Sequence, residues 1–319
     1  MPLHATRREM LKWTGLTAGA TLLPGVVTAE ELPQRRRVLR LAHLTDMHIQ
    51  PELAAAEGVT ACLQHLQSLA DKPDLILSGG DTIMDSLATR MDRTKLQWEL
   101  WTNTLKSNCS IRVESCLGNH DIWGWNKKSS GTTGEEPEWG KKWACDVFGI
   151  ERSYRSFDHA GWHFVLLDSM MPHEETVFTA RIDDAQWDWL HNDLAATKPE
   201  TPVLVLSHIP ILSACVLAGW SKVKPGDITV SHQLMHTDVA RLLDLFWKHQ
   251  NVKLCLSGHL HLRERVNYNG VTYLCNGAVS GGWWKGDHQQ TKAGYAIIDL
   301  FADGTFEDQY VPYGWQAKV

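Results

Sequence analysis

Five short apolar segments of this sequence are each followed at once by residues that can turn the chain or bind a metal. The segments are the length of buried strands and cover residues 38–44, 74–77, 111–117, 203–206 and 253–256. Behind them come Asp46-Met47-His48, Gly79-Gly80-Asp81, Gly118-Asn119-His120-Asp121, Ser207-His208 and Gly258-His259-Leu260-His261. Ligands of α/β sheets bind beyond the carboxyl ends of the strands, so we expect these groups to converge at one edge.

Helical and hairpin signals fill the intervals between these segments. The apolar spacing predicts helices over 53–70, 92–106, 183–195 and 235–249, with Asp183 and Asp184 in the first turn of the third. Turn dipeptides predict hairpins at Ala160-Gly161, Asn269-Gly270 and Asp303-Gly304. Residues 122–150 predict a long functional loop with a short helix near its end. Together the pattern favours an α/β fold with a sheet-rich core and helices outside.

The predicted convergence has the chemistry of a transition-metal site. It contains two carboxylates, one amide and four imidazoles: Asp46, His48, Asp81, Asn119, His208, His259 and His261. Oxygen and imidazole ligands suit zinc, manganese, iron or cobalt. A single ion would leave several of these groups unused. Two ions about 3.5–4 Å apart can hold both the attacking and the leaving oxygen of a phosphoryl displacement.

Composition narrows the functional class. The formal net charge of -6 gives no support for a nucleic-acid polymer as partner, because such binding requires a basic surface. The seven cysteines are scattered without a C-x-x-C pair, which disfavours a cysteine-ligated zinc site. Most of them lie among apolar residues, so we expect buried core thiols.

The N-terminal segment is typical of an export signal. Arg7-Arg8 precedes Met10-Leu11-Lys12 and a moderately apolar stretch, and this resembles the twin-arginine signal of bacteria. The stretch contains Gly15, Gly19 and Pro24 and is too short for a membrane span. We therefore predict a signal peptide at 1–29, a linker at 30–36 and one enzymatic domain at 37–319, with no stable membrane span in the mature chain. The resemblance implies the twin-arginine export machinery as a partner and a periplasmic or extracellular location.

The order of the polar motifs resembles the calcineurin-like metallophosphoesterase family. The shared pattern is Asp-x-His, Gly-Asp, Gly-Asn-His-Asp, His and Gly-His-x-His, and it spans residues 38 to about 280. The resemblance implies two mixed β-sheets packed face to face and flanked by helices. It also implies a metal-dependent phosphoesterase that attacks a small phosphate mono- or diester with a hydroxide bridging two metal ions, with manganese, iron or zinc expected.

The same resemblance implies a role for each motif residue. One metal would be held by Asp46, His48 and His261, and the other by Asn119, His208 and His259. Asp81 would bridge the two ions. His120 would lie over the metals, where it stabilises the transition state or protonates the leaving oxygen. Asp121 would orient His120 by accepting its second N–H.

Substrate features are less sharply specified. Purple acid phosphatases carry a tyrosine three residues after the bridging aspartate, where this sequence has Met84, so a purple iron site is not expected. The motif order also matches the class III cyclic nucleotide phosphodiesterase branch, which includes glycerophosphodiesterases. Nearby tryptophans either contact a nucleobase or sugar or pack the loops onto the sheet, and these are Trp123, Trp125, Trp220, Trp283 and Trp284. A catalytically silent metal-binding scaffold of the same fold is the alternative function.

Overall fold

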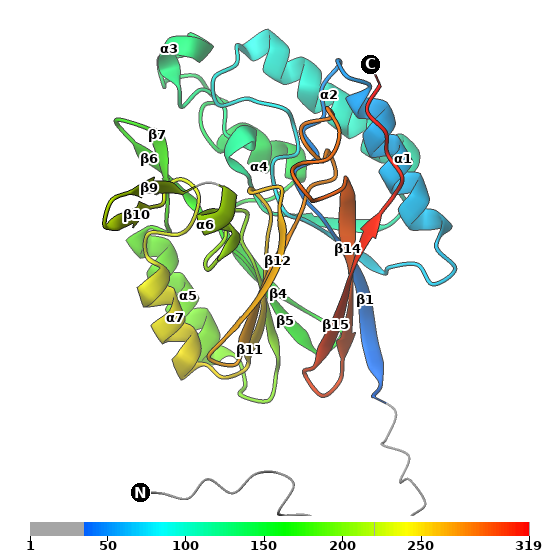
Figure 1. The fold of residues 1–319 in the computed structure, drawn as a ribbon, viewed down its shortest axis with the longest axis vertical. Coiled ribbons are helices and arrows are strands. Elements are labelled where there is room, and N and C mark those ends of the chain that lie inside the picture. Colours follow the sequence, from blue (N-terminus) through cyan, green and yellow to red (C-terminus); the bar gives the residue numbers. More distant parts are fainter. Residues whose placement is uncertain (1–34, 220, 319) are drawn as a thin grey trace, which may run out of the picture. The chain divides into compact units, whose positions relative to one another are not determined.

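The structure, a computed structural model, describes residues 35–219 and 221–318. The predicted signal peptide, all of the predicted linker except its last two residues, and Trp220 lie outside the described residues. Within the described part, two mixed β-sheets face each other, with helices on both outer sides (Figure 1). The predicted sandwich is therefore confirmed.

The first sheet has five strands in the order β15-β14-β1-β2-β3. Its strands β1, β2 and β3 are parallel, and β14 and β15 add to β1 in antiparallel fashion. The bounds of these strands are β1 Arg37–Leu44, β2 Leu75–Ser78, β3 Arg112–Ser115, β14 Gly294–Phe301 and β15 Phe306–Pro312.

The second sheet has six strands in the order β12-β13-β11-β8-β5-β4. Strands β13, β11, β8 and β5 are parallel, and an antiparallel strand closes each edge. The bounds are β4 Arg155–His159, β5 Trp162–Leu166, β8 Val203–Leu206, β11 Val252–Ser257, β12 Arg263–Tyr268 and β13 Val271–Asn276.

Helices cover the outer face of each sheet. Helices α1 (Ala55–Ser68), α2 (Met91–Asn108) and α4 (Lys142–Phe148) pack on the first sheet. Helices α5 (Asp184–Ala196) and α7 (Val239–Lys248) pack on the second. Among the described residues, no helix is both long enough and apolar enough to cross a lipid bilayer.

The alternation of side chains along the strands explains the layers. Successive residues of a strand point to opposite faces of a sheet. On β8, Leu204 and Leu206 enter the core between the sheets, whereas Val203 and Val205 pack against α5 and α7. Both faces are buried, which is why this strand is an uninterrupted apolar run in the sequence. Because the parallel strands of each sheet run in the same direction, their carboxyl ends lie at one edge of the sandwich.

Several local predictions were incomplete. The 122–150 segment holds two short helices rather than one, because α3 (Lys127–Ser130) precedes α4. Asp183 is the N-cap of α5 instead of a first-turn residue, and its carboxylate accepts a hydrogen bond from the Gln186 backbone N–H at 2.7 Å. Helix α7 begins at Val239, four residues later than expected.

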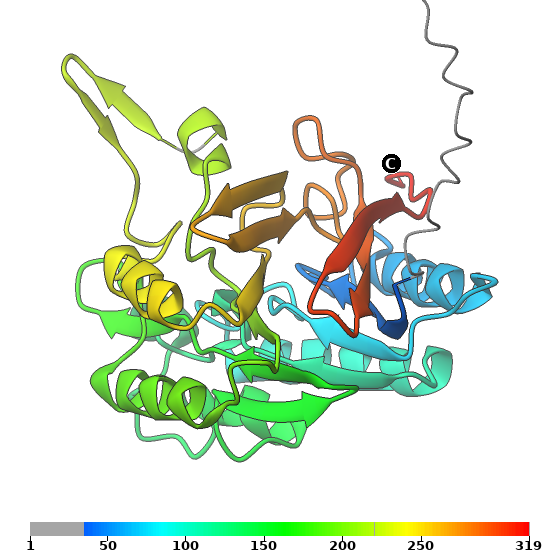
Figure 2. The ribbon, with the colours of Figure 1, turned by 90° about the horizontal axis from the view of Figure 1, so that it is seen from below.

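Two hairpins and, besides α3, two short helical segments were not predicted. Strands β6 (Met170–His173) and β7 (Val177–Ala180) form one hairpin. Strands β9 (Lys222–Lys224) and β10 (Asp227–Thr229) form the other, which follows helix α6 (Cys215–Gly219). The β9–β10 hairpin is the yellow-green ribbon that extends away from the sheets in Figure 2. Besides α6, the other helical segment is the single turn η2 (Asn119–Asp121).

Two ion pairs of His163 join the β4–β5 hairpin to helix α5. The two ring nitrogens of His163 lie 2.7 Å from Asp158 Oδ1 and 2.8 Å from Asp193 Oδ2. Burial lowers the pKa of His163, but the two carboxylates outweigh burial and leave that pKa raised. The folded state therefore holds the imidazolium form more tightly than the unfolded chain does. This stability is fully present below the unfolded pKa and is lost as the pH rises through the folded pKa.

We predict that His163→Gln lowers the free energy of unfolding by about 1 kcal/mol at pH 5.5, with a smaller loss at pH 9. Urea unfolding at the two pH values measures the difference. His191→Gln, an exposed change on α5, is the matched control and is expected to have little effect at either pH. An equal loss of unfolding free energy at pH 5.5 and pH 9 would show that the His163 contacts do not depend on a charged imidazole.

Candidate metal centre

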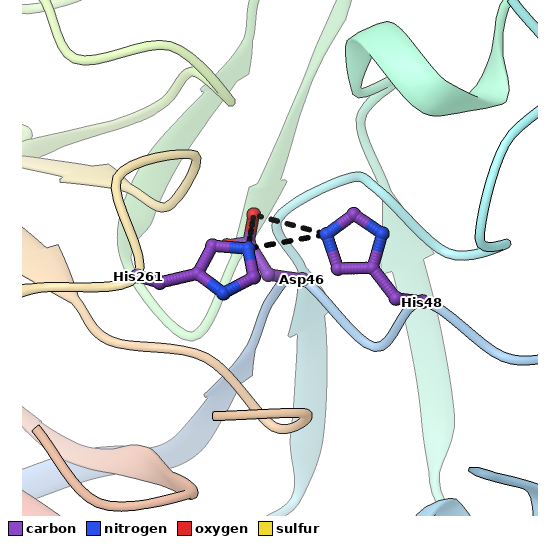
Figure 3. A group of neighbouring side chains, drawn as sticks. All are labelled: Asp46, His48 and His261. Atoms are coloured by element: carbon purple, nitrogen blue, oxygen red, sulfur yellow. Dashed lines mark hydrogen bonds and ion pairs between the residues drawn. The ribbon is translucent and has the colours of Figure 1, made fainter. Parts of the chain in front are cut away.

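The loops after β1 and β11 bring three predicted ligands together. His261 Nε2 lies 3.3 Å from Asp46 Oδ1 and 3.1 Å from His48 Nε2 (Figure 3). All three side chains are almost completely buried. Two imidazole nitrogens and a carboxylate oxygen thus face one point in a dry environment, which is favourable only when a proton or a cation lies among them. This donor set can hold a metal ion.

A second group forms beside the first. His208 Nε2 lies 3.2 Å from Asp81 Oδ2 and 3.3 Å from Asn119 Oδ1, and His259 completes the group. Asp81 also faces the first group, because its Oδ2 lies 3.7 Å from His48 Nε2. The structure therefore brings all seven predicted ligands together, with the Asp81 carboxylate between the two groups.

Backbone carbonyl groups orient three of the histidines. His208 Nδ1 contacts Gly79 O at 2.7 Å, and His261 Nδ1 contacts Gly281 O at 2.5 Å. His259 Nε2 contacts Gln233 O at 3.0 Å. A ring N–H donated to a carbonyl fixes the tautomer and turns the other nitrogen, with its lone pair, toward the cluster. The protein thus prepares these rings as ligands before any ion is bound.

The ligand loops adopt an unusual backbone conformation. Asp46, His48, Asp81, His259 and His261 all have positive φ, between 44° and 67°. This region is costly for residues with a Cβ, although Asp, Asn and His enter it more readily than most. Hydrogen bonds between loops hold it: Asp46 N–H donates to Gly80 O and His48 N–H to Asp81 O, each at 3.0 Å. Such strain is typical of functional sites.

Two motif glycines are required by the closeness of the loops. A Cβ on Gly118 would lie 2.1 Å from both the backbone nitrogen and Oδ1 of Asp81. A Cβ on Gly258 would lie 2.2 Å from Asp46 Oδ2. Any larger residue would displace a predicted ligand, so these glycines serve the geometry of the site.

Electrostatics favour the protonation states that a metal requires in four of the predicted ligands. Burial raises the pKa of Asp46, but the neighbouring His261 outweighs it and the pKa is lowered. Burial also raises the pKa of Asp81, and His208 and His120 reverse the effect. Burial lowers the pKa values of His48 and His259 to about 3. The carboxylates are therefore anionic and these two imidazoles neutral at pH 7, as metal ligation demands. His208 differs, because Asp81 outweighs burial and raises the pKa of His208 to about 9, so a metal ion would have to displace a proton from this ring.

His120 lies at the exposed side of the cluster. Its ring meets that of His48 edge-on, with centroids 5.0 Å apart, and its side chain keeps 29% of its surface exposed. Burial lowers the pKa of His120, but Asp81 and Asp85 outweigh burial and raise the pKa to about 9. The imidazolium form is thus favoured at neutral pH beside the predicted metal site.

The expected contact between Asp121 and His120 is wrong. The Asp121 carboxylate instead accepts backbone hydrogen bonds from Gly118 and Thr82, both at 2.9 Å, and so fixes the turn that carries Asn119. The residue beside His120 is Asp85, whose Oδ1 lies 3.3 Å from His120 Nδ1. The sequence signal for Asp85 was its place in the loop only four residues after Asp81.

The tryptophans divide into two groups. Trp123 and Trp284 are each only 1% exposed, so the predicted substrate contacts of these two residues are wrong. Trp123 donates its indole N–H to Thr89 O, and Trp284 donates to His48 O at 2.9 Å. Trp284 thereby supports the loop of a predicted ligand.

The other two predicted substrate contacts that the structure describes, Trp125 and Trp283, are partly exposed. Trp283 is half-buried and stacks on His261 with ring centroids 4.2 Å apart. Trp125 is also half-buried and lies under the ammonium group of Lys141, which is 5.3 Å from its ring centroid. Lys141 in turn bonds to Asp168 Oδ2 at 2.5 Å, so the loop of Trp125 is tied to the end of β5. Trp283 is thus the described tryptophan that lies directly on the cluster.

Comparison with known proteins agrees with this geometry. Residues 39–263 match the family model described as calcineurin-like phosphoesterase. The chain belongs to this family. A probable cyclic nucleotide phosphodiesterase of Synechococcus sp. is 25% identical over 278 residues, which cover 85% of this chain and 91% of that protein. A 3',5'-cyclic-nucleotide phosphodiesterase of Nostoc sp. is 26% identical over 301 residues, with coverages of 89% and 95%.

Solved structures share the fold. A dimetal phosphatase from Danio rerio superposes with a TM-score of 0.57 at 15% identity, covering 87% of this chain and all of that one. The anchor protein of the inner membrane complex of Plasmodium gives 0.51 at 16% identity, with coverages of 86% and 85%. The family membership and the clustered donors show a metal-dependent phosphoesterase with a dinuclear centre for divalent metal ions.

We predict that Asp85→Asn lowers kcat by about 10- to 100-fold without loss of bound metal. Asp85 helps raise the pKa of His120, so the alkaline limb of the pH–rate profile is expected to move to lower pH. Steady-state kinetics and elemental analysis measure both effects. Asp121→Asn is the contrasting variant, because it weakens the turn of Asn119 and is expected to lower the thermal midpoint. An unshifted pH profile in Asp85→Asn would contradict the pairing with His120.

Proposed function

We propose that the protein is a phosphodiesterase whose substrate is a small phosphodiester of the 3',5'-cyclic nucleotide class, with a glycerophosphodiester as the related possibility. The names of the Synechococcus and Nostoc relatives support the first class, and both similarities extend over most of each chain. The observation that carries the proposal is the position of Asp81 between two donor groups, with His120 alongside.

The proposed ligand assignment follows the two donor groups. Asp46, His48 and His261 would hold one ion, and Asn119, His208 and His259 the other, with Asp81 shared. We propose manganese, iron or zinc, because the donors are oxygen and imidazole nitrogen. When bound, the ions supply Lewis acidity toward the phosphoryl group and activate water for attack.

His120 is proposed to act on the leaving oxygen. Cleavage of a diester expels an alkoxide, which needs a proton at neutral pH. The His120 imidazolium can donate that proton. Asp85 Oδ1 faces Nδ1 at 3.3 Å, so Nε2 is proposed as the donating nitrogen. His120 is therefore proposed as the catalytic acid, and Asp85 as its positioning residue.

Trp283 is proposed to contact the organic part of the substrate. Its ring lies on His261 and keeps part of its surface exposed, so a planar base can stack on it. The predicted contacts of Trp125 and Trp220 stay predictions.

We also propose export. The arginine pair at Arg7-Arg8 supports a signal peptide at 1–29, a linker at 30–36 and a catalytic domain at 37–319, carried by the twin-arginine machinery to the periplasm or the exterior. A folded protein with metals loaded in the cytoplasm suits this route.

The decisive test combines metal analysis with diester turnover. We expect the purified protein to bind about two metal ions and to hydrolyse bis-p-nitrophenyl phosphate and a 3',5'-cyclic nucleotide faster than p-nitrophenyl phosphate. His120→Ala is expected to keep both ions and to lose about 10²- to 10⁴-fold in kcat. Elemental analysis and kinetics on the same samples measure this.

The outcomes separate the alternatives. Two ions without turnover of any ester would support the catalytically silent scaffold. Faster turnover of the monoester would replace the diesterase proposal with a phosphatase. Unchanged kcat in a metal-replete His120→Ala variant would remove the proposed role of that residue.

Trp283→Leu is expected to raise KM for a 3',5'-cyclic nucleotide by about tenfold, because one stacked ring contributes about 1–3 kcal/mol. KM for a glycerophosphodiester, which has no base, is expected to change much less. Trp283→Phe keeps an aromatic face and is the matched control. Equal effects on both substrates would show that Trp283 acts through His261 and not on the base, and metal content is measured in each variant.

A further inference from the structure

Two thiols from distant parts of the sequence meet beside the metal centre. Cys215 is the first residue of α6, and Cys275 lies in β13. Cys275 is 2% exposed, and Cys215 is half-buried. The phosphoesterase chemistry uses neither residue.

Glu264 brings the two cysteines together. Its Oε2 accepts the backbone N–H groups of Ala214 and Cys215, each at 2.9 Å, and its Oε1 lies 3.3 Å from Cys215 Sγ. Glu264 is also the direct partner of Cys275 in the antiparallel β12–β13 ladder. Directly opposed residues project to the same face of a sheet, so the Glu264 and Cys275 side chains are neighbours, and Cys215 contacts Glu264.

The surroundings keep the pair in place. Cys215 packs on the apolar cluster that contains Cys275, Val216, Leu260 and Leu262. Cys275 Sγ also lies 3.1 Å from Gly258 O, the carbonyl that precedes His259. The two cysteines therefore share one apolar cluster, where a shift of the segment that Cys215 begins can bring the sulfurs to the S–S bond length of about 2.05 Å.

We propose that Cys215 and Cys275 form a disulfide that ties the segment after β8 to β13. The oxidant is a small-molecule or protein disulfide. The more accessible Cys215 thiolate attacks it and expels one thiol, and the Cys275 sulfur then displaces the second thiol. Two protein thiols and one oxidant disulfide thus become one protein disulfide and two oxidant thiols.

The bond would act on the ligand loops. The segment that Cys215 begins continues through the β9–β10 hairpin to Gln233, whose carbonyl orients His259. The Cys275 side chain contacts the same Gly258–His259 loop. A covalent link between them restricts movement of this segment relative to the loop that carries His259. Such a bond persists in an oxidising compartment, which agrees with the proposed export.

Peptide mapping tests the link directly. The metal-loaded full chain is treated with oxidised glutathione, denatured, alkylated with iodoacetamide and digested with trypsin. Cys215 and Cys275 fall in separate peptides, 182–222 and 266–285, with one cysteine each. We expect these peptides joined, with a mass lower than their sum by two hydrogen atoms. Alkylation of both thiols after oxidation would overturn the proposal, as would joining of either peptide to another cysteine.

Functional consequences supply a second readout. Oxidation is expected to raise the thermal midpoint by roughly 5 °C and to slow metal removal by EDTA about threefold or more. A phosphine reductant is expected to reverse both changes. Cys215→Ser and Cys275→Ala are each expected to abolish the response to oxidation, whereas Cys109→Ser, at another half-buried thiol, is the control that keeps it. A response that persists in Cys215→Ser and Cys275→Ala would overturn the proposal.

Discussion

The site depends on the contacts that the Asp81 carboxylate makes. It lies between the two donor groups, facing His48 and His208, and its Oδ1 also accepts the backbone N–H of His120 at 2.8 Å. A buried carboxylate is costly unless hydrogen bonds and positive charge compensate it. The surrounding imidazoles and the proposed metal ions supply that compensation. Without the Asp81 carboxylate, the two donor groups would have no ligand in common.

The two-sheet fold makes this convergence possible. Asp46 and Asp81 come from the first sheet, whereas His208 and His261 come from the second, and no single strand could supply them all. The shared apolar core between the sheets fixes the distance between the two sets of loops. Packing far from the site thus determines whether its donor atoms meet.

Much of this arrangement was predictable because strand burial and ligand position leave a direct pattern in the sequence. Fully buried strands such as β8 are continuous apolar runs, and the polar residues after them mark the carboxyl edge. Hydrogen-bond partners were less predictable. Asp121 follows His120 directly, yet the turn at Asn119 directs its carboxylate back to Gly118 and leaves Asp85 beside the ring.

Other features that the sequence did not predict have similar causes. Trp123 and Trp125 lie two residues apart in the same loop, but Trp123 is buried and Trp125 is half-buried. The burial of each ring depends on how the 122–150 loop folds over itself. The β9–β10 hairpin lacks an alternating buried face, since its strand residues are all exposed, so no apolar pattern revealed it. Its Pro225-Gly226 turn was the available signal.

The positive φ of five ligand residues also affects how substitutions in this site should be interpreted. Asp, Asn and His combine metal-binding atoms with a tolerance for left-handed backbone that alanine lacks. An alanine at His48 or His259 removes a donor atom and also disfavours the loop conformation that places its neighbours. Glycine removes the donor but permits the same backbone. Comparing the two substitutions at one position separates the contribution of the side chain to metal affinity from the cost of shaping the loop.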